Sequence, residues 1–263
     1  ITELALEVTV RDESGLPVST RQEVIRHPAA FYIGVRSDAW NGEAGEELGF
    51  DIYTVNWDQK ASGNHSLTAN FMKVEWVEGE IDPSTGDVQY DRVTTLVDSA
   101  EVSVDASGKG RVAVTPPDPG VYLLEVRSGN AVTEYSVWVM GAGSAQWPRL
   151  SDDSLQLQAD AELYEPGDDA LINIPNPYEG ETLALVTVER GNVMRSEVLT
   201  IEEAVYQYAL PIGEDDAPNI YFTVMLIESA RGSKPSFRYG AINITVDRAG
   251  LLMQVTLTPA PQP

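Results

Sequence analysis

The sequence predicts an all-β fold of tandem antiparallel β-sandwiches without substantial helix. No window of about a dozen residues shows the 3.6-residue apolar stripe of a surface helix. The 21 glycines and 16 prolines are scattered at the spacing of turns. Between these turns lie short apolar runs, several of which alternate with polar residues as half-buried strands do.

The first expected strand runs from Leu4 to Val10, where every second residue is apolar. Asp12–Gly15 then predicts a turn, and Phe31–Val35 predicts another strand. Further strands are expected at residues 120–126, 135–140, 154–159, 170–174, 183–188, 206–212, 220–227 and 241–246.

A hairpin is expected around residues 106–110, because short Val-rich runs lie on both sides of this Gly-containing turn. In such a hairpin, Val102 and Val104 would face Val112 and Val114 across one ladder.

The segment from Leu163 to Gly191 raises the question of whether it is a reactive site or scaffold. Glu165–Asp168 contains Pro-Gly and predicts a tight turn. The following Pro175–Gly180 cannot continue a ladder, because its two prolines lack N–H donors. Leu183–Val188 is short and apolar, which is typical of a strand in a sandwich core. These signals favour scaffold.

Composition excludes several functions. The formal net charge of −24 argues against nucleic-acid binding, which needs clustered Lys and Arg, and disfavours an anionic membrane surface. No apolar run approaches the roughly 20 residues of a membrane span. The absence of cysteine excludes disulfides, thiolate metal sites and cysteine nucleophiles within this sequence. Self-repulsion also favours a monomer.

Catalytic patterns are not found. His27 and His65 are the two histidines, and neither lies in a known catalytic motif such as G-x-S-x-G or H-E-x-x-H. A Ser-His-Asp set assembled in space stays open, since sequence spacing does not exclude it. We expect no enzymatic activity, no catalytic or cofactor-binding residues and no cofactor.

Three acidic clusters, at residues 151–154, 167–170 and 213–218, raise the question of calcium. Calcium takes 6–8 converging oxygen ligands, and none of the clusters has the D-x-[DN]-x-[DN]-G spacing of a calcium loop. They are interpreted as solvated turn residues, and no metal ligand is predicted.

Tryptophans are a further candidate, because an exposed indole can form a sugar-binding platform. Trp57 lies near a predicted turn and is the best exposed candidate, whereas Trp138 is expected in the core or in inter-domain packing. Trp147 is expected to pack one domain on the next. Asn64 and Asn243 match the short glycosylation pattern, which matters only in a glycosylating host.

The order of these motifs resembles the alpha-2-macroglobulin family, and specifically its bacterial members. The run "LYEPGDDALINIPNPYEGETLALVTVERG" resembles the family's Y-x-PGD, strand and ERG pattern, and "APNIYFTVMLI" its following strand. Upstream, "TPPDPGVYLLEV" and "YSVWVMG" resemble the end of a preceding domain. The resemblance spans nearly the whole chain and implies macroglobulin-type sandwiches of the fibronectin III/Ig-like kind.

The resemblance also implies a function. Such proteins are secreted or periplasmic inhibitors that trap a protease after it cleaves a bait segment. This chain is then expected to be structural framework that lacks the bait and the Cys–Gln thioester, with proteases as partners of the full-length protein. The alternative is a sugar- or surface-binding sandwich module of a bacterial adhesin.

Four domain segments are expected on the same basis. Residues 1–37 would be the last strands of a preceding macroglobulin-type domain, 38–142 and 143–248 two complete sandwiches, and 249–263 the first strand of a following domain. The linker Gly141–Ser154, rich in small residues, is the predicted hinge.

Overall fold

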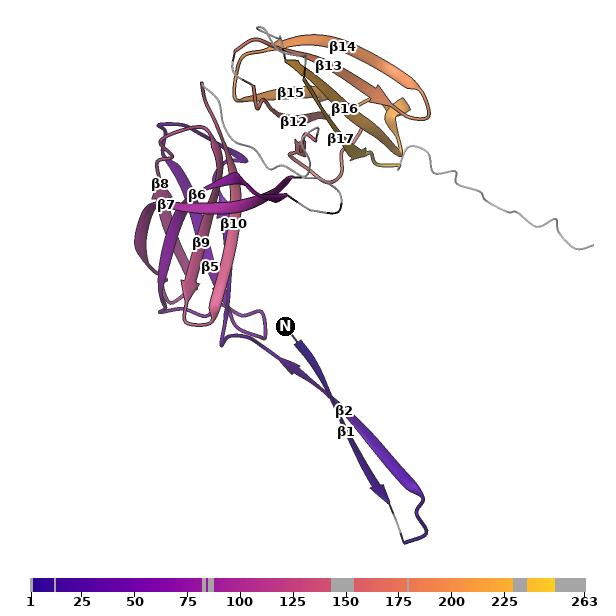
Figure 1. Ribbon diagram of the computed structural model, residues 1–263. Helices are drawn as coiled ribbons and strands as arrows, with labels where there is room; N and C mark the ends of the chain where they lie inside the picture. The colour runs from indigo at the N-terminus through magenta and orange to yellow at the C-terminus, as the bar shows by residue number, and fades with distance from the viewer. Residues whose placement is uncertain are drawn as a thin grey trace, which may run out of the picture. The chain divides into compact units, whose positions relative to one another are not determined.

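The computed structural model describes residues 2–11, 13–81, 84, 88–142, 154–178, 180–228 and 236–248. Over these residues the chain forms antiparallel sheets, with one 3₁₀ turn at Glu214–Asp216 as its helical element (Figure 1). The predicted all-β fold of tandem sandwiches is therefore confirmed. Among the described residues, no helix is long and apolar enough to cross a membrane. Most of the predicted linker Gly141–Ser154, Trp147 within it and residues 249–263 lie outside the described residues.

The N-terminal strands β1 (Thr2–Arg11) and β2 (Pro17–Arg26) form a two-stranded antiparallel ribbon. The predicted alternation is confirmed in the register, where Leu4 pairs with Val24 and Val10 with Val18 on one face. All four of these side chains are exposed.

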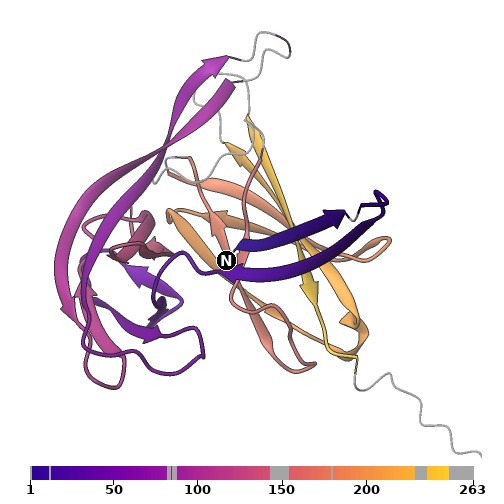
Figure 2. The ribbon, with the colours of Figure 1, turned by 90° about the horizontal axis from the view of Figure 1, so that it is seen from below.

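The first sandwich consists of a three-stranded and a five-stranded sheet. The smaller sheet has the order β3-β5-β8, and the larger has the order β4-β10-β9-β6-β7. Their bounds are β3 (Tyr32–Ser37), β4 (Asn41–Glu43), β5 (Leu48–Val55), β6 (Ser66–Ile81), β7 (Val88–Ser103), β8 (Lys109–Val114), β9 (Gly120–Ser128) and β10 (Ala131–Met140). Strands β6 and β7 make a long twisted ribbon, which Figure 2 shows along its length.

Aromatic rings fill the core of this sandwich. Phe71 from β6 stacks on Tyr122 from β9, with ring centroids 4.9 Å apart, and Phe50 from β5 lies 6.4 Å from Phe71. Each of these three side chains is at most 1% exposed. Trp138 is 5% exposed, so its predicted burial is confirmed.

The predicted hairpin around residues 106–110 is wrong as a single ladder. Strand β7 belongs to the five-stranded sheet, whereas β8 pairs with β5 in the three-stranded sheet. The turn is present, because the Asp105 carboxylate accepts hydrogen bonds from the backbone N–H groups of Ser107 and Lys109. It carries the chain from one sheet to the other, and the valines on its two sides are all buried.

The second sandwich also has two sheets, with the orders β11-β12-β15 and β14-β13-β16-β17 (Figure 1). Its strands are β11 (Gln158–Ala159), β12 (Asp169–Pro175), β13 (Thr182–Glu189), β14 (Val193–Ile201), β15 (Val205–Pro211), β16 (Asn219–Glu228) and β17 (Phe237–Thr245). A continuous apolar cluster lies between the sheets and includes Ile172, Ile174, Phe222 and Val224, each with no exposed surface.

Strand β13 differs from the expected core strand. Ala184 and Val186 face the core, but Leu183 and Leu185 are 47% and 37% exposed on the outer face. The reason is geometric. The sheet that contains β13 packs with one face against the β11-β12-β15 sheet, and successive side chains of a strand point to opposite faces.

The chain divides into two compact units. One contains Ile1–Lys73, Thr94–Pro117 and Tyr122–Trp138, and the other contains the remaining segments, including Val74–Val93 and Val139–Pro263. The boundary between the two units therefore falls within strands β6 and β7: β6 is divided after Lys73, and β7 is divided before Thr94.

Truncating Phe222 tests the core assignment. We expect Phe222→Ala to lower the free energy of unfolding by about 3–5 kcal/mol, because it removes a fully buried ring and leaves a cavity. The matched control is Tyr221→Ala, because the neighbouring ring points outward and is 50% exposed. Urea denaturation followed by circular dichroism measures both. Equal losses for the two variants would contradict the assigned faces of β16.

Candidate functional site

Both histidines lie in contacts that join the segment after β2 to the first sandwich. The His27 ring stacks on Trp57 at a centroid distance of 4.9 Å, and its Nδ1 lies 2.5 Å from the Tyr32 hydroxyl. Trp57 Nε1 donates a hydrogen bond of 2.9 Å to the carbonyl of Ala29. Trp57 is exposed as predicted, but His27 covers one face of the indole that a sugar platform would need.

His65 stacks on Phe31 with ring centroids 3.9 Å apart, and its Nε2 lies 2.9 Å from Ser62 Oγ. A nucleophilic triad needs a carboxylate to orient the imidazole in addition to the hydroxyl. The described contacts give His65 an aromatic ring and a hydroxyl, which position the loop from Ala61 to Ser66.

The acidic cluster at residues 213–218 is built into the second sandwich. Asp216 is 3% exposed, so the predicted solvated turn is wrong for this residue. Its Oδ2 accepts hydrogen bonds of 2.9 Å from Arg195 Nη2 and from the Gly213 backbone N–H. In the cluster at residues 167–170, Asp168 Oδ2 accepts a hydrogen bond from the Glu165 N–H and closes the Pro-Gly turn.

No group of three or more His, Asp or Glu side chains suited to a metal ion occurs among the described residues. The 151–154 cluster lies outside that part of the chain except for Ser154.

The turn at Glu189–Gly191 joins β13 to β14, as the sequence predicts. Gly191 takes the left-handed conformation, with φ of 75°. Arg190 then reaches across to the 213–218 segment, where its guanidinium donates hydrogen bonds to the carbonyls of Ala217 (2.5 Å) and Asp215 (2.6 Å). Sequence spacing gave no signal for this contact, because the partners are more than 20 residues apart.

The Asp160–Tyr164 pair lies in the segment that leads into the second sandwich, before β12. Asp160 Oδ1 accepts hydrogen bonds from the Tyr164 hydroxyl at 2.7 Å and from the Leu171 N–H at 2.9 Å. Burial, together with this hydrogen bond to Asp160, raises the pKa of Tyr164 to about 12. The backbone of Tyr164 also forms hydrogen bonds with Thr245 and Asp247, so this one residue holds the segment before β12 against the end of β17.

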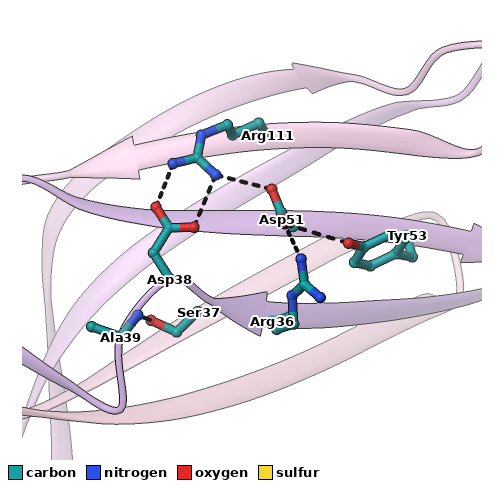
Figure 3. Close-up of polar contacts among 7 residues, drawn as sticks. All are labelled: Arg36, Ser37, Asp38, Ala39, Asp51, Tyr53 and Arg111. Atoms are coloured by element: carbon teal, nitrogen blue, oxygen red, sulfur yellow. Dashed lines mark hydrogen bonds and ion pairs between the residues drawn. The ribbon is translucent and has the colours of Figure 1, made fainter.

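An ion-pair network lies on the outer face of the β3-β5-β8 sheet (Figure 3). Arg111 on β8 contacts both carboxylate oxygens of Asp38 and donates a hydrogen bond of 2.9 Å to Asp51 on β5. Arg36 on β3 donates to the other oxygen of Asp51 at 2.7 Å. Asp38 follows β3 directly, at the point where the chain leaves for β4 in the opposite sheet, so Arg111 anchors this crossing.

These contacts shift the protonation equilibria. The hydrogen bond from Arg111 lowers the pKa of Asp38, and those from Arg36 and Arg111 lower the pKa of Asp51. All four charged groups are at least partly exposed, so the network resembles a solvated surface cluster rather than a reactive site.

Comparison with known proteins decides the family. Residues 34–141 match the family model for bacterial macroglobulin domain 6, and residues 155–263 match that for the alpha-2-macroglobulin bait region domain. The chain belongs to the alpha-2-macroglobulin family. The two matches cover most of its length, and the predicted resemblance is confirmed for internal domains of the family.

Individual relatives agree with this assignment. A curated alpha-2-macroglobulin from Rickettsia conorii is 25% identical over 213 residues, which are 76% of this chain and 11% of the relative. The chain therefore spans about a tenth of the length of that family member.

Solved structures give weaker likenesses. The native conformation of E. coli alpha-2-macroglobulin is 19% identical, with a TM-score of 0.38, covering 93% of this chain and 17% of that one. The D0-D1 domain of intimin is 12% identical, with a TM-score of 0.33, covering 81% of this chain and 97% of that one. Both scores are below 0.5, so the family assignment rests on the sequence matches.

The match at residues 155–263 bears on the bait. The family resemblance predicts that the bait lies outside this chain, whereas these residues match the family domain that is named for the bait region. Within that match, the motifs of the resemblance lie at Tyr164, at Arg190 and at Ala217, where they hold turns and loops together.

Removing Arg111 tests the ion-pair network. We expect Arg111→Gln to raise the pKa of Asp38 towards its ordinary value, and that of Asp51 less, because Arg36 still contacts Asp51. Since both pKa values are lowered in the folded state, the network stabilises the fold above the ordinary carboxylate pKa. That contribution is lost as the pH falls through the lowered values. Carboxyl NMR titration measures the shifts.

Gly49→Ala is the companion variant. A Cβ at Gly49 would lie 2.3 Å from both Arg111 Nη2 and Asp38 Oδ2, so it displaces the ion pair without removing a charge. The Asp38 pKa should rise as in Arg111→Gln. An unchanged Asp38 titration in both variants would show that Arg111 does not set it.

Arg190 provides the next test. We expect Arg190→Gln to destabilise the second sandwich by about 1–2 kcal/mol, because two backbone carbonyls lose charged donors. Hydrogen exchange at Glu214–Ala217 should accelerate. The matched control is Arg21→Gln on the β1–β2 ribbon, which removes the same charge from a 3.5 Å pair with the exposed Glu23. Unchanged exchange in Arg190→Gln would show that the 213–218 segment holds its position without this side chain.

Proposed function

We propose that this chain is non-catalytic framework of a protease-trapping protein of the alpha-2-macroglobulin type, and that proteases are partners of the complete polypeptide. The observation that carries the proposal is the order of the two family matches, a macroglobulin domain followed by the bait region domain. Protease trapping would be an activity of the complete polypeptide, because this chain spans only about a tenth of the length of its curated relative.

The described contacts support a framework role. The imidazoles of His27 and His65 pack against aromatic rings, and the buried carboxylate of Asp216 is hydrogen-bonded to Arg195 and to backbone. Arg190 and Tyr164 are also used in holding loops. An enzyme would need a nucleophile, a base and an orienting group aimed at one point.

We further propose that the β1–β2 ribbon of the expected 1–37 segment completes a preceding macroglobulin-type domain, whereas β3 (Tyr32–Ser37) pairs with β5 and is grouped with the first sandwich. The sandwich that ends at residue 142 and residues 143–248 would form two domains, and residues 249–263 would begin the next. The β1–β2 ribbon supports the first of these boundaries. A two-stranded ribbon is only marginally stable in water, and this one exposes Leu6, Val8 and Val10 at 59%, 58% and 64%.

We also propose an extracytoplasmic location for the complete polypeptide, because a protein that traps extracellular proteases would act outside the cytoplasm.

Size-selective inhibition tests the trapping proposal. The complete polypeptide is mixed with an endopeptidase, and cleavage of a large protein substrate is compared with cleavage of a small chromogenic peptide. A trap shields the enclosed protease from large substrates only, so cleavage of the protein should fall while cleavage of the peptide continues. The 263-residue chain alone should change neither rate.

The control is the same endopeptidase inactivated at its active site, which should leave the polypeptide uncleaved. Equal inhibition of both substrates would indicate an active-site inhibitor instead of a trap. Hydrolysis by the chain itself that disappears in His65→Ala would overturn the non-catalytic role.

A further inference from the structure

The second sandwich contains a cavity of about 240 Å³ between β14 and β15, which are the edge strands of its two sheets. Glu197 and Arg195 of β14 lie opposite Val186 and Val188 of β13, whose side chains are buried in the core. Residues directly opposite each other share a face of the sheet, so both charged side chains point toward the opposite sheet. Charged and apolar groups therefore line the same cavity.

The inner part of the cavity is apolar. Val186, Val188 and Leu210 line it, and each is at most 3% exposed. At the other edge of the same sheet, an extended segment covers β17, where the Leu155 N–H donates a hydrogen bond of 2.8 Å to the Tyr239 carbonyl. The side chain of Leu155 is buried there. The sandwich thus closes one edge with aliphatic groups, and the inner part of the cavity suits the same chemistry.

The outer part of the cavity carries an unmatched negative charge. Arg195 is paired with the carboxylate of Asp216 at 2.9 Å, so its charge is balanced. Glu197 is exposed, and its Oε2 accepts a hydrogen bond of 3.0 Å from the Tyr208 hydroxyl. Burial, together with this hydrogen bond, raises the pKa of Tyr208, so the phenol remains a neutral donor. Among the described residues, Glu197 therefore has no cationic partner.

The size and chemistry of the cavity define its ligand. Drug-sized ligands occupy pockets of about 300–1,000 Å³, so this cavity suits a smaller group of a few carbons. An aliphatic chain that ends in an ammonium group can bury its methylenes and keep its charge near water. The ammonium can also donate a charge-assisted hydrogen bond to Glu197. The net charge of −24 favours the approach of a cation over that of an anion.

We propose that the cavity between β14 and β15 binds an alkylammonium group, with its chain against Val188 and Leu210 and its ammonium on Glu197. Two sources supply such a group, which are a free aliphatic amine and the lysine side chain of an extended polypeptide. The inference concerns this cavity alone, so it does not depend on protease trapping.

Methyl and amide NMR of the 263-residue chain tests the site with n-butylammonium, 1-butanol and butyrate, which share a carbon chain and differ in charge. We expect n-butylammonium to shift the methyl signals of Val186, Val188 and Leu210. Its dissociation constant should be on the order of millimolar, because a ligand of few atoms gains little binding free energy. 1-Butanol should bind about tenfold more weakly, because it lacks the charge-assisted hydrogen bond to Glu197. Butyrate should bind more weakly still.

Two matched variants separate the role of Glu197 from that of net charge. Glu197→Gln keeps an acceptor for the Tyr208 hydroxyl but removes the charge, so n-butylammonium and 1-butanol should bind alike. Glu202→Gln removes the same charge from an exposed residue between β14 and β15, outside the cavity lining. It should keep the preference for n-butylammonium. Unchanged methyl signals of the core in both variants check that the fold is retained.

A further arm identifies the source of the ammonium group. A blocked peptide of alternating threonine and valine with one central lysine is compared with the same peptide carrying norleucine. Tighter binding of the lysine peptide than of n-butylammonium, with amide shifts along β14 or β15, would assign the site to a polypeptide strand added at an edge. Binding of n-butylammonium alone would assign it to a free amine. Both results support the site.

Three results would overturn the proposal. The first is the absence of methyl shifts at Val186, Val188 and Leu210 when n-butylammonium is added well above millimolar concentration. The second is equal or tighter binding of 1-butanol or butyrate to the unsubstituted chain, which would show that Glu197 does not select a cation. The third is an equal loss of preference in Glu202→Gln and Glu197→Gln, which would reduce the effect to overall charge.

Discussion

Both sandwiches depend on burying one face of each strand against an opposing sheet. The sequence has no cysteine, so disulfides contribute nothing within this chain. Apolar burial, worth about 25 cal/mol per Å², therefore supplies the main stabilisation. Phe50 and Phe71 serve this purpose in the first sandwich, and Ile172 and Phe222 serve it in the second. The alternation of side chains along the strands follows from this requirement.

Polar contacts have a different task, which is to fix the segments that join the sheets. Asp216 is buried with Arg195 and a backbone N–H as partners, and a buried carboxylate is tolerable only with such partners. Arg190 and Tyr164 likewise bind carbonyl and carboxylate oxygens of segments distant in sequence. The short motifs that carry the family resemblance are thus where the loops are held.

Local sequence patterns predict many of the strands in this chain, but β2, β6 and β14 are not among the expected ones, and pairing is predicted less well. The alternation from Leu4 to Val10 gives both the strand and its faces. The turn at residues 106–110 is also evident, but a turn does not tell whether the chain returns to the same sheet or passes to the other. The contacts of Arg111 with Asp38 and of Arg190 with Ala217 join distant positions, and no local pattern encodes them.

The two faces of β13 have a consequence for folding. In most half-covered strands, a slip of one residue would move polar side chains into the core, so the hydrophobic pattern fixes the register. In β13 such a slip exchanges Ala184 and Val186 for Leu183 and Leu185, which are also apolar. The pattern therefore distinguishes the two alignments only weakly. The register is held instead by the irregularity at Val188/Glu189 and by the turn beyond it, whose Arg190 is bound to the opposite segment.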